Sequence, residues 1–375
     1  MRIVFTGGGT GGHFYPIIAV AEEVRALARE RRLVPPQLYF FAPDPCDAGL
    51  LAKYEIIFVK TPAGKLRRYA DKRNIIDAFT TAWGVIKTLG LLFYHYPDVV
   101  FGKGGYGSFP TLLAARILRI PVVIHESDSV PGRVNRWAGK FAARIAVSFA
   151  DSAQFFPSAK TAWTGHPVRN VLRAPSADGA REFLKLETDA PVLLVLGGSQ
   201  GAQAINELIL SSLSKLTEQF QVIHQTGKEN FAEAAARGRV ILEGNGHAER
   251  YHPFGFLDEE ALRMAAGVAS LVVSRAGSTI FEIAAWGLPS IIIPIAESNG
   301  DHQRKNAYAY AESGAAAVLE ETNLSPALFL AEIAKIIGSE SRRAEMARAA
   351  RAFAKPDASR VIGEKLLEIG LSHEH

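Results

Sequence analysis

Cysteine is almost absent from this sequence, and that scarcity limits the chemistry available to it. Cys46 is the single cysteine in 375 residues, so an internal disulfide is excluded and a reducing compartment is expected. The amino terminus, Met1 to Phe5, runs directly into glycines and leaves no room for an apolar signal region. We therefore expect a protein of the cytoplasm, with Cys46 a bystander rather than a nucleophile.

Long apolar runs and a strong charge of one sign are also missing. The longest apolar stretches, such as Gly90–Phe93 and Ser290–Ile295, fall far short of the roughly 20 residues that a membrane-spanning helix needs. Lys and Arg number 42 against 38 Asp and Glu, a net charge of +4, which does not indicate a nucleic-acid-binding protein. We expect no membrane span and no nucleic-acid partner.

What the sequence does contain is an alternation of short, β-branched apolar runs with longer helical patterns. This alternation is typical of parallel strands joined by crossover helices, so we predict an α/β fold of two Rossmann-like domains facing a cleft. The expected strands are Arg2–Thr6, Gln37–Phe41, Val99–Phe101, Val122–His125 and Arg144–Val147, then Val192–Leu196, Val222–Gln225, Leu271–Ser274 and Ser290–Pro294.

A stretch rich in proline and small residues separates the two series of strands. It runs from Thr164–Pro167 to Arg173–Gly179 and has the composition of an interdomain connector. We predict a first domain over 1–163 and a second over 164–355. The tail at about 356–371 has helical periodicity and is expected to pack back on the first domain.

A glycine cluster follows the first strand of each predicted domain, Gly7–Gly12 in one and Gly197–Gly201 in the other. Such turns expose backbone N–H groups at a helix N-terminus, where a diphosphate is favoured. Gly7, Gly9 and Gly12 even fit the dinucleotide pattern, but Asp44 lies some 30 residues beyond Gly12, too far for the usual ribose acid. Neither cluster ends in Gly-Lys-Ser/Thr, so a Walker loop is excluded.

Eight short motifs in a fixed order make the pattern specific. They are Gly7-Gly8-Gly9-Thr10-Gly11-Gly12-His13, Gly102-Lys103-Gly104-Gly105-Tyr106, His125-Glu126, Gly165-His166-Pro167-Val168-Arg169, Gly197-Gly198-Ser199-Gln200-Gly201, Gln225-Thr226-Gly227, Ser274-Arg275-Ala276-Gly277 and Asp301-His302-Gln303. From Met1 to about Ala317 the chain resembles the MurG family, which transfers N-acetylglucosamine from UDP-N-acetylglucosamine to lipid I and forms lipid II for peptidoglycan. The resemblance implies the GT-B type of glycosyltransferase fold.

The resemblance also implies a donor site on the second domain. Glu282 would bind the uridine ribose, Leu257 would offer its backbone to uracil, and Arg169 would reach the nucleotide. The remaining donor ligands implied are Ser199, Gln200, Ser278, Thr279 and Gln303.

The acceptor site is expected on the first domain. Its diphosphate would face Thr10, Gly11, Gly12, Gly104, Gly105 and Tyr106. A general base must take the proton of the attacking hydroxyl, and His13 and Glu126 are the two candidates. His13 could instead only cap the helix or bind phosphate, and Glu126 could instead bind sugar.

Two sequence features bear on the details of the reaction. No Asp-x-Asp motif occurs, so neither a metal nor another cofactor is expected, and backbone donors of the second loop would stabilise the leaving UDP. Where the family usually reads His-Glu-Gln-Asn, this chain has Ser127 and Asp128, and Arg304 replaces a glutamine found in some members. The resemblance implies a substrate contact at Asp128, but a carboxylate cannot donate the hydrogen bond that the family's amide can.

A basic and apolar segment is the candidate membrane contact. Lys65, Arg67, Arg68, Lys72 and Arg73 precede the apolar stretch from Ile75 to Phe93. The family's lipid-linked acceptor favours membrane contact for Ile75–Trp83, and the second half is expected to be buried against the sheet. We expect a peripheral protein at the cytoplasmic face of the inner membrane. Cell-wall synthesis proteins are possible partners, but the sequence contains no motif that would identify their binding surface.

Two other functions stay open. A related enzyme that uses UDP-N-acetylglucosamine, such as an epimerase or a glycolipid transferase, would have a similar donor half, but an epimerase would not need the basic and apolar segment. A non-catalytic module that binds nucleotide sugars would need no base near the first loop, and His13 argues against it.

Overall fold

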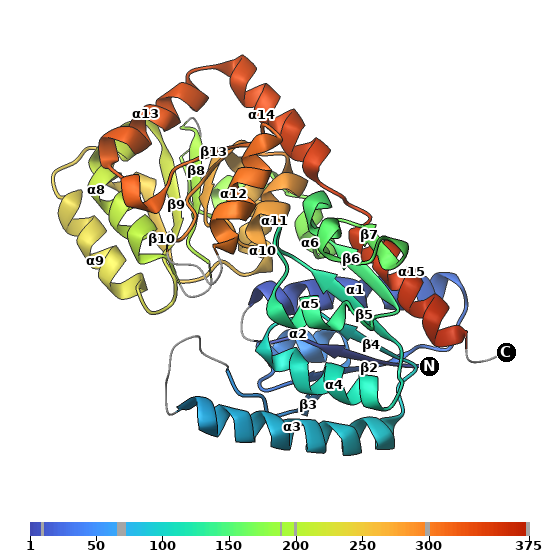
Figure 1. The fold of residues 1–375 in the computed structure, drawn as a ribbon. Coiled ribbons are helices and arrows are strands. Elements are labelled where there is room, and N and C mark those ends of the chain that lie inside the picture. Colours follow the sequence, from blue (N-terminus) through green and yellow to red (C-terminus); the bar gives the residue numbers. More distant parts are fainter. Residues whose placement is uncertain (9–10, 66–72, 188–189, 199–200, 297–300, 373–375) are drawn as a thin grey trace. The chain divides into compact units, whose positions relative to one another are not determined.

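The computed structural model describes the chain except residues 9–10, 66–72, 188–189, 199–200, 297–300 and 373–375. It divides into two compact units (Figure 1). Unit 1 comprises Met1–Arg169 and Lys355–His375, and unit 2 comprises Asn170–Ala354. The unit boundary therefore lies six residues after the predicted one at 163/164, and Arg169 belongs to unit 1 instead of the second domain.

Unit 1 is built on a parallel sheet with the strand order β3-β2-β1-β4-β5-β6-β7 in the described residues. The strands are β1 (Arg2–Thr6), β2 (Gln37–Ala42), β3 (Ile56–Lys60), β4 (Val99–Gly102), β5 (Val122–Glu126), β6 (Arg144–Val147) and β7 (Thr161–Trp163). The helices are α1 (Gly11–Glu30), α2 (Ala48–Lys53), α3 (Arg73–His95), α4 (Phe109–Ile117), α5 (Arg133–Ala138) and α15 (Ala358–Leu371). This is the doubly wound arrangement that the sequence predicts.

The sheet of unit 1 has an apolar core on each face. One core packs α1 and α15 against side chains such as Ile3 and Phe5, and the other packs α3, α4 and α5 against side chains such as Val4 and Val100. Successive strand residues such as Val4 and Phe5 thus belong to opposite cores. Figure 1 shows helices on both faces of this sheet, as expected of a parallel sheet.

Unit 2 repeats the plan on a second parallel sheet, in the order β10-β9-β8-β11-β12-β13. Its strands are β8 (Val192–Leu196), β9 (Gln221–Gln225), β10 (Tyr251–Phe254), β11 (Ala269–Ser274), β12 (Ser290–Ile292) and β13 (Ala316–Val318). Its helices are α6 (Asn170–Arg173), α7 (Ala180–Phe183), α8 (Gln203–Gln219), α9 (Phe231–Ile241), α10 (Glu259–Val268), α11 (Thr279–Trp286), α12 (His302–Glu312), α13 (Pro326–Ile337) and α14 (Glu340–Phe353).

The carboxyl-terminal helix α15 belongs to unit 1 although its sequence follows unit 2. Ile362, Leu366 and Leu367 are buried in the same core as α1. Arg360 adds an ion pair of 2.7 Å to Glu30 at the end of α1. The apolar contacts account for most of this docking, because an exposed ion pair contributes little.

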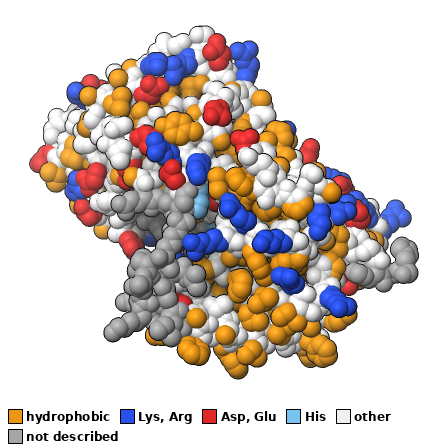
Figure 2. Space-filling view, in the orientation of Figure 1, with side chains coloured by type: hydrophobic (Ala, Val, Ile, Leu, Met, Phe, Trp, Pro, Cys, Tyr) orange, Lys and Arg blue, Asp and Glu red, His pale blue; other side chains and the backbone are white. Residues whose placement is uncertain are grey.

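Helix α3 presents an apolar stripe to solvent. Its exposed members Ile76, Phe79, Trp83 and Ile86 are three or four residues apart, and Phe93 follows seven residues later. The opposite side of the helix packs along α4 and buries Thr88 and Leu92. The second half of the helix is thus only partly buried, contrary to the sequence prediction. Figure 2 shows hydrophobic side chains gathered over this part of unit 1, with Lys and Arg side chains beside them.

By length and composition, one stretch of α3 is apolar enough to cross a membrane. It is Ile76–His95, with a mean hydropathy of 1.3 over its window, of which 17% is buried. The prediction that no segment approaches this length is wrong because it counted uninterrupted apolar runs, and single Asp, Lys and Gly residues interrupt this one. In the fold, α3 is the crossover that connects β3 to β4 of one sheet.

Candidate active site

The first glycine loop follows β1 at the centre of the sheet of unit 1 and packs against a second glycine turn. Gly104 and Gly105 have φ values of 83° and 77°, a region that favours glycine. A Cβ on Gly105 would lie 2.6 Å from the Gly8 carbonyl oxygen and 3.4 Å from Nε2 of His13. The two turns therefore meet through backbone at Gly8 and Gly105, where a side chain on Gly105 would not fit. Thr10 lies outside the described residues.

Glu126 ends β5 and is buried, with both carboxylate oxygens occupied. Oε1 accepts a hydrogen bond from the Asp128 N–H at 2.9 Å, and Oε2 accepts from the Gly132 N–H and from Asn135 Nδ2, each at 3.0 Å. Burial, and then the charge of Asp128, raise the pKa of Glu126 to about 7 despite these donors. The carboxylate orders the 128–132 segment and titrates near neutral pH.

Lys103 is a buried cation that the sequence analysis did not single out as a site residue. It follows β4 directly, its side chain is 1% exposed, and its Nζ donates to Ser127 Oγ. Burial lowers the pKa of Lys103 to about 8, and the charges of Glu126 and Asp128 oppose that shift. A lysine immediately after a buried strand was the available signal, because such a position faces the carboxyl edge of the sheet.

His13 lies in the first turn of α1, beside Gly105. Burial, and then the positive charge of Lys103, lower the pKa of His13 to about 4, whereas the charge of Asp128 raises it. The imidazole is therefore neutral at pH 7, which is the protonation state that a general base requires. His13, Lys103, Glu126 and Asp128 form one electrostatic group, which we call the acceptor-loop cluster.

Three other predicted site residues lie in the same unit. Asp128 uses its backbone, donating to Glu126 and accepting from Ser152 Oγ at 2.6 Å, so these bonds do not depend on an amide side chain. Tyr106 begins a short 3-10 turn after Gly105, and burial raises the pKa of its hydroxyl. Arg169 is buried, with its guanidinium 4.2 Å from the ring centre of Tyr15 on α1.

Next to the cluster, a buried pair of histidines holds the segments that follow β6 and β7. Ser148 Oγ lies 3.2 Å from Nε2 of His125 and 3.1 Å from Nδ1 of His166, and His125 also contacts the Gly165 carbonyl at 3.1 Å. Burial holds the pKa values of both rings well below their usual range. These neutral histidines are part of the scaffold.

The second glycine loop follows β8 at the centre of the sheet of unit 2. Gly198 and Gly201 both have a φ of 79°. A Cβ on Gly201 would lie 2.3 Å from the Thr226 carbonyl oxygen, so only glycine fits there. Ser199 and Gln200, the predicted diphosphate ligands, lie outside the described residues.

Gln225, at the end of β9, joins the second loop to the segment predicted to contact uracil. Its backbone carbonyl accepts from the Gly197 N–H at 3.1 Å, and its side-chain Oε1 accepts from the Leu257 N–H at 3.1 Å. The Leu257 backbone is thus held in register with the glycine loop.

The remaining predicted donor residues lie on α11 and α12. Ser278 precedes α11, Thr279 begins it, and Glu282 is a half-buried residue of its first turn. Gln303, in the first turn of α12, accepts a hydrogen bond from the Ile295 N–H at 3.2 Å. Arg304 pairs with Glu320 at 2.8 Å, so in this structure its side chain is directed to the next segment of unit 2.

Metal-ligating side chains are not grouped in the part of the chain that the structure describes. No set of three or more His, Cys, Asp or Glu residues there could hold an ion.

Comparison with known proteins bears on both units. Models of the glycosyltransferase family 28 N-terminal and C-terminal domains match residues 3–147 and 192–362. A Treponema denticola relative, named UDP-N-acetylglucosamine–N-acetylmuramyl-(pentapeptide) pyrophosphoryl-undecaprenol N-acetylglucosamine transferase, is 36% identical over 97% of this chain and 96% of its own. A Shouchella clausii relative of the same name is 36% identical over 97% and 98%.

Solved structures give the same picture of the fold. Acinetobacter baumannii MurG matches with a TM-score of 0.72 and 25% identity over 98% of this chain and 99% of that chain. A Neisseria meningitidis UDP-GlcNAc 2-epimerase bound to UDP-GlcNAc matches with a TM-score of 0.68 and 15% identity over 98% and 100%, which supports the fold alone. The chain therefore belongs to glycosyltransferase family 28 and, within it, to the MurG family of N-acetylglucosamine transferases.

Proposed function

We propose that this protein transfers N-acetylglucosamine from UDP-N-acetylglucosamine to the muramyl sugar of lipid I, forming lipid II for peptidoglycan synthesis. The observation that carries the proposal is the full-length likeness to transferases named for this reaction. Two features of the structure also support the proposal, namely a cluster of ionisable groups at the first glycine loop and a neutral, glycine-lined turn at the second.

The reaction is a single displacement with inversion at the anomeric carbon. The acceptor hydroxyl forms the new C–O bond, the bond from that carbon to UDP breaks, and the hydroxyl proton passes to a base. We assign the base to His13, because its imidazole is neutral at pH 7, whereas Glu126 uses both oxygens to accept three N–H groups. Glu126 then acts as a positioning residue for the acceptor loop.

The donor is bound by unit 2 in this proposal. The Gly197 and Gly201 N–H groups donate within the protein, to the Gln225 and Gly198 carbonyls. The other backbone N–H groups of the second loop, with Ser199 and Gln200, would take the diphosphate and its developing charge, without a metal cofactor. Leu257 would contact uracil through its backbone, Glu282 would accept hydrogen bonds from the ribose hydroxyls, and Gln303 would hold the sugar. Arg169, Ser278 and Thr279 are further candidate contacts, and Gly11, Gly12, Gly104, Gly105 and Tyr106 are assigned to the acceptor diphosphate.

A transfer assay tests the proposal directly. Purified protein is incubated with radiolabelled UDP-N-acetylglucosamine, a lipid I analogue and EDTA, and the label is followed into lipid. We expect labelled lipid II that appears only when the acceptor is present. Epimerised sugar or free UDP without lipid labelling would overturn the acceptor assignment and favour an epimerase. Binding of the donor without turnover would favour a non-catalytic module.

We further propose that the apolar stripe of α3 rests on an anionic membrane surface, so that the enzyme reaches a lipid-linked acceptor without leaving the cytoplasmic face of the inner membrane. The stripe is exposed at positions from Ile76 to Phe93, with Trp83 60% and Phe79 74% exposed. Lys87 on α3 and Arg116 and Arg119 at the end of the adjacent α4 are exposed as well. Apolar insertion combined with basic charge is what binding to acidic lipid requires.

Sedimentation with phosphatidylglycerol vesicles tests this contact. The double change Phe79→Ser and Trp83→Ser should reduce vesicle binding several-fold, since each aromatic ring loses its burial in lipid, and should leave transfer to a soluble acceptor analogue unchanged. Val240→Ser, which removes a side chain 70% exposed on α9, is the matched control. Equal vesicle binding by the double variant and the native protein would contradict the proposal.

A further inference from the structure

We infer that a chain of hydrogen bonds through Tyr251, His224, Asn206 and Thr226 positions the second glycine loop for the donor diphosphate. This inference rests on the proposed function, because the loop is assigned to the donor there. It makes His224, Asn206 and Tyr251 positioning residues of the transferase.

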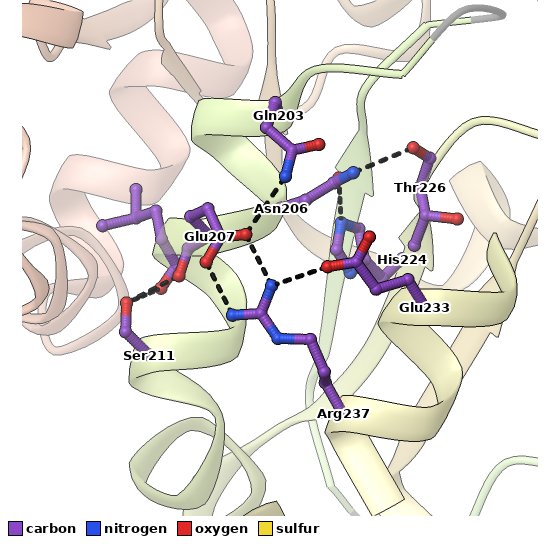
Figure 3. A network of polar contacts seen from close by, with 9 residues as sticks. Gln203, Asn206, Glu207, Ser211, His224, Thr226, Glu233 and Arg237 are labelled. Carbon is purple, nitrogen blue, oxygen red and sulfur yellow. Dashed lines mark hydrogen bonds and ion pairs between the residues drawn. The ribbon is translucent and has the colours of Figure 1, made fainter. Parts of the chain in front are cut away.

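The chain of bonds lies in the interior of unit 2. Asn206 on α8 is 3% exposed and His224 on β9 is fully buried. Tyr251 OH lies 3.1 Å from His224 Nδ1, His224 Nε2 lies 3.0 Å from Asn206 Oδ1, and Asn206 Nδ2 donates to the Thr226 carbonyl at 3.0 Å. Figure 3 shows the Asn206 side chain directed toward Thr226 and the His224 ring directed toward Asn206.

The Thr226 carbonyl fixes the direction of every bond in the chain. A carbonyl oxygen only accepts, so the Asn206 amide must donate through Nδ2 and accept through Oδ1. His224 must then carry its proton on Nε2, and its bare Nδ1 accepts from the Tyr251 hydroxyl. Burial lowers the pKa of His224 to about 3, so the ring is neutral and has one donor and one acceptor, as this order requires.

The end of the chain coincides with the contact that shapes the loop. The Thr226 carbonyl is the group that a Cβ on Gly201 would meet at 2.3 Å, and Asn230 Nδ2 also donates to it at 3.2 Å. The adjacent Gln225 carbonyl holds the Gly197 N–H, and the Gln225 side chain holds the Leu257 N–H. The turn at 225–226 therefore touches both ends of the glycine loop and the predicted uracil contact.

The attachment of α8 to the neighbouring helix α9 does not require these buried hydrogen bonds. Glu207, the residue after Asn206, pairs with Arg237 of α9 at 2.6 Å, and Arg237 also pairs with Glu233 (Figure 3). These side chains are 40% or more exposed and hold the two helices at the surface. The buried hydrogen bonds fix the orientation of the Thr226 carbonyl at the loop, which an ion pair at the surface cannot do.

Asn206→Asp is the sharpest test, because it replaces the donating amide by an acceptor that faces the Thr226 carbonyl. We expect the KM for UDP-N-acetylglucosamine and the Kd for UDP to rise about tenfold, the effect of one lost buried hydrogen bond. The KM for the lipid I analogue and the pH profile should stay unchanged. Kinetics and calorimetric titration with UDP measure these values.

Matched variants separate positioning from general packing. His224→Gln keeps an N–H that can reach Asn206 and should bind UDP nearly as the native protein does, whereas His224→Leu should resemble Asn206→Asp. Tyr251→Phe removes only the outermost bond, keeps the ring, and should raise the donor KM about twofold. Glu207→Gln breaks the ion pair with Arg237 and should leave the donor KM unchanged.

The inference is overturned if Asn206→Asp and Tyr251→Phe both bind UDP as the native protein does. It is also overturned if Glu207→Gln weakens UDP binding as much as Asn206→Asp, or if both donor and acceptor KM change in proportion to lost thermal stability. A native protein that neither binds UDP nor transfers sugar would instead refute the proposed function, and this inference with it.

Discussion

The two glycine loops follow equivalent strands of two similar sheets, yet their surroundings differ in kind. Around the first lie ionisable side chains, with Lys103 and Glu126 buried and His13 beside Gly105. Around the second, the described contacts are neutral amides, hydroxyls and a neutral imidazole, among them Gln225 and His224. Similar glycine turns thus lie once among ionisable groups and once among neutral ones.

The difference has a direct consequence for pH dependence. Glu126 and His13 have pKa values of about 7 and 4, so the first loop changes charge in a range where activity can be measured. His224 remains neutral until about pH 3. Changes at the first loop should therefore alter pH profiles, and changes at the second should alter only donor binding.

The largest expected effect comes from His13→Gln. Removal of the base should lower kcat about 100- to 10,000-fold, because general-base assistance is lost while the polar side chain keeps the helix start intact. Rapid-quench transfer assays with the lipid I analogue measure kcat, and UDP titration should give a Kd close to that of the native protein. A loss below about tenfold would remove His13 from the base role and favour Glu126.

Glu282→Ala should act on the donor alone. Loss of a carboxylate that accepts the ribose hydroxyls should raise the KM for UDP-N-acetylglucosamine about 10- to 100-fold, as expected for charged hydrogen bonds. The acceptor KM should be unchanged. A UDP-sugar with deoxyribose in place of ribose provides the control. It should bind the native protein more weakly than UDP-N-acetylglucosamine does, whereas Glu282→Ala should bind the two ligands with similar affinity. If the variant still binds the deoxyribose ligand much more weakly, Glu282 does not contact the ribose.

Lys103→Met should shift the pH profile. The Lys103 charge favours the ionised carboxylate of Glu126 and the neutral ring of His13, so without it both pKa values rise. The acidic limb of kcat/KM should move up by about one pH unit. Lys215→Met, at an exposed position of α8, should leave the limb in place.

Asp128→Asn should move the limb that reports His13 in the opposite direction and by less, because the Asp128 charge affects the pKa of His13 less than the Lys103 charge does. The Asp128 charge raises the pKa of Glu126 and of His13, so its removal lowers both and extends activity to lower pH. The Lys103→Met and Asp128→Asn double variant should have its limb between those of the single variants. A limb that does not move in Asp128→Asn would contradict the electrostatic account of the acceptor-loop cluster.

The sequence predicted the interior strands of both sheets but not the strands at their edges. The strands missed were β3, β7, β10 and β13, and each lies at the edge of its sheet. An interior strand such as β8 (Val192–Leu196) is a continuous apolar run because both faces are covered, whereas an edge strand such as β7 (Thr161–Trp163) is largely exposed and lacks that pattern. The doubly wound plan itself followed from the interior strands alone.

The site divides in a similar way. The glycine loops and His13 could be predicted because their residue types have a local backbone or chemical reason. Asn135 could not, because its role comes from meeting Glu126 at the sheet edge, which local sequence does not encode. The place of Lys103 directly after a buried strand was a signal in the sequence, but its electrostatic coupling to Glu126 arises only in the fold. The Asn206–His224 pair joins positions 18 residues apart and depends in the same way on the packing of α8 against β9.

The most direct test of the division between the two halves is the pH dependence of kcat/KM for the lipid I analogue, measured on the native protein, Lys103→Met, Asp128→Asn and Asn206→Asp. The account predicts an acidic limb that Lys103→Met moves to higher pH, that Asp128→Asn moves to lower pH, and that Asn206→Asp leaves in place while weakening donor binding. A shift of the acidic limb in Asn206→Asp, or no shift in either Lys103→Met or Asp128→Asn, would contradict this account.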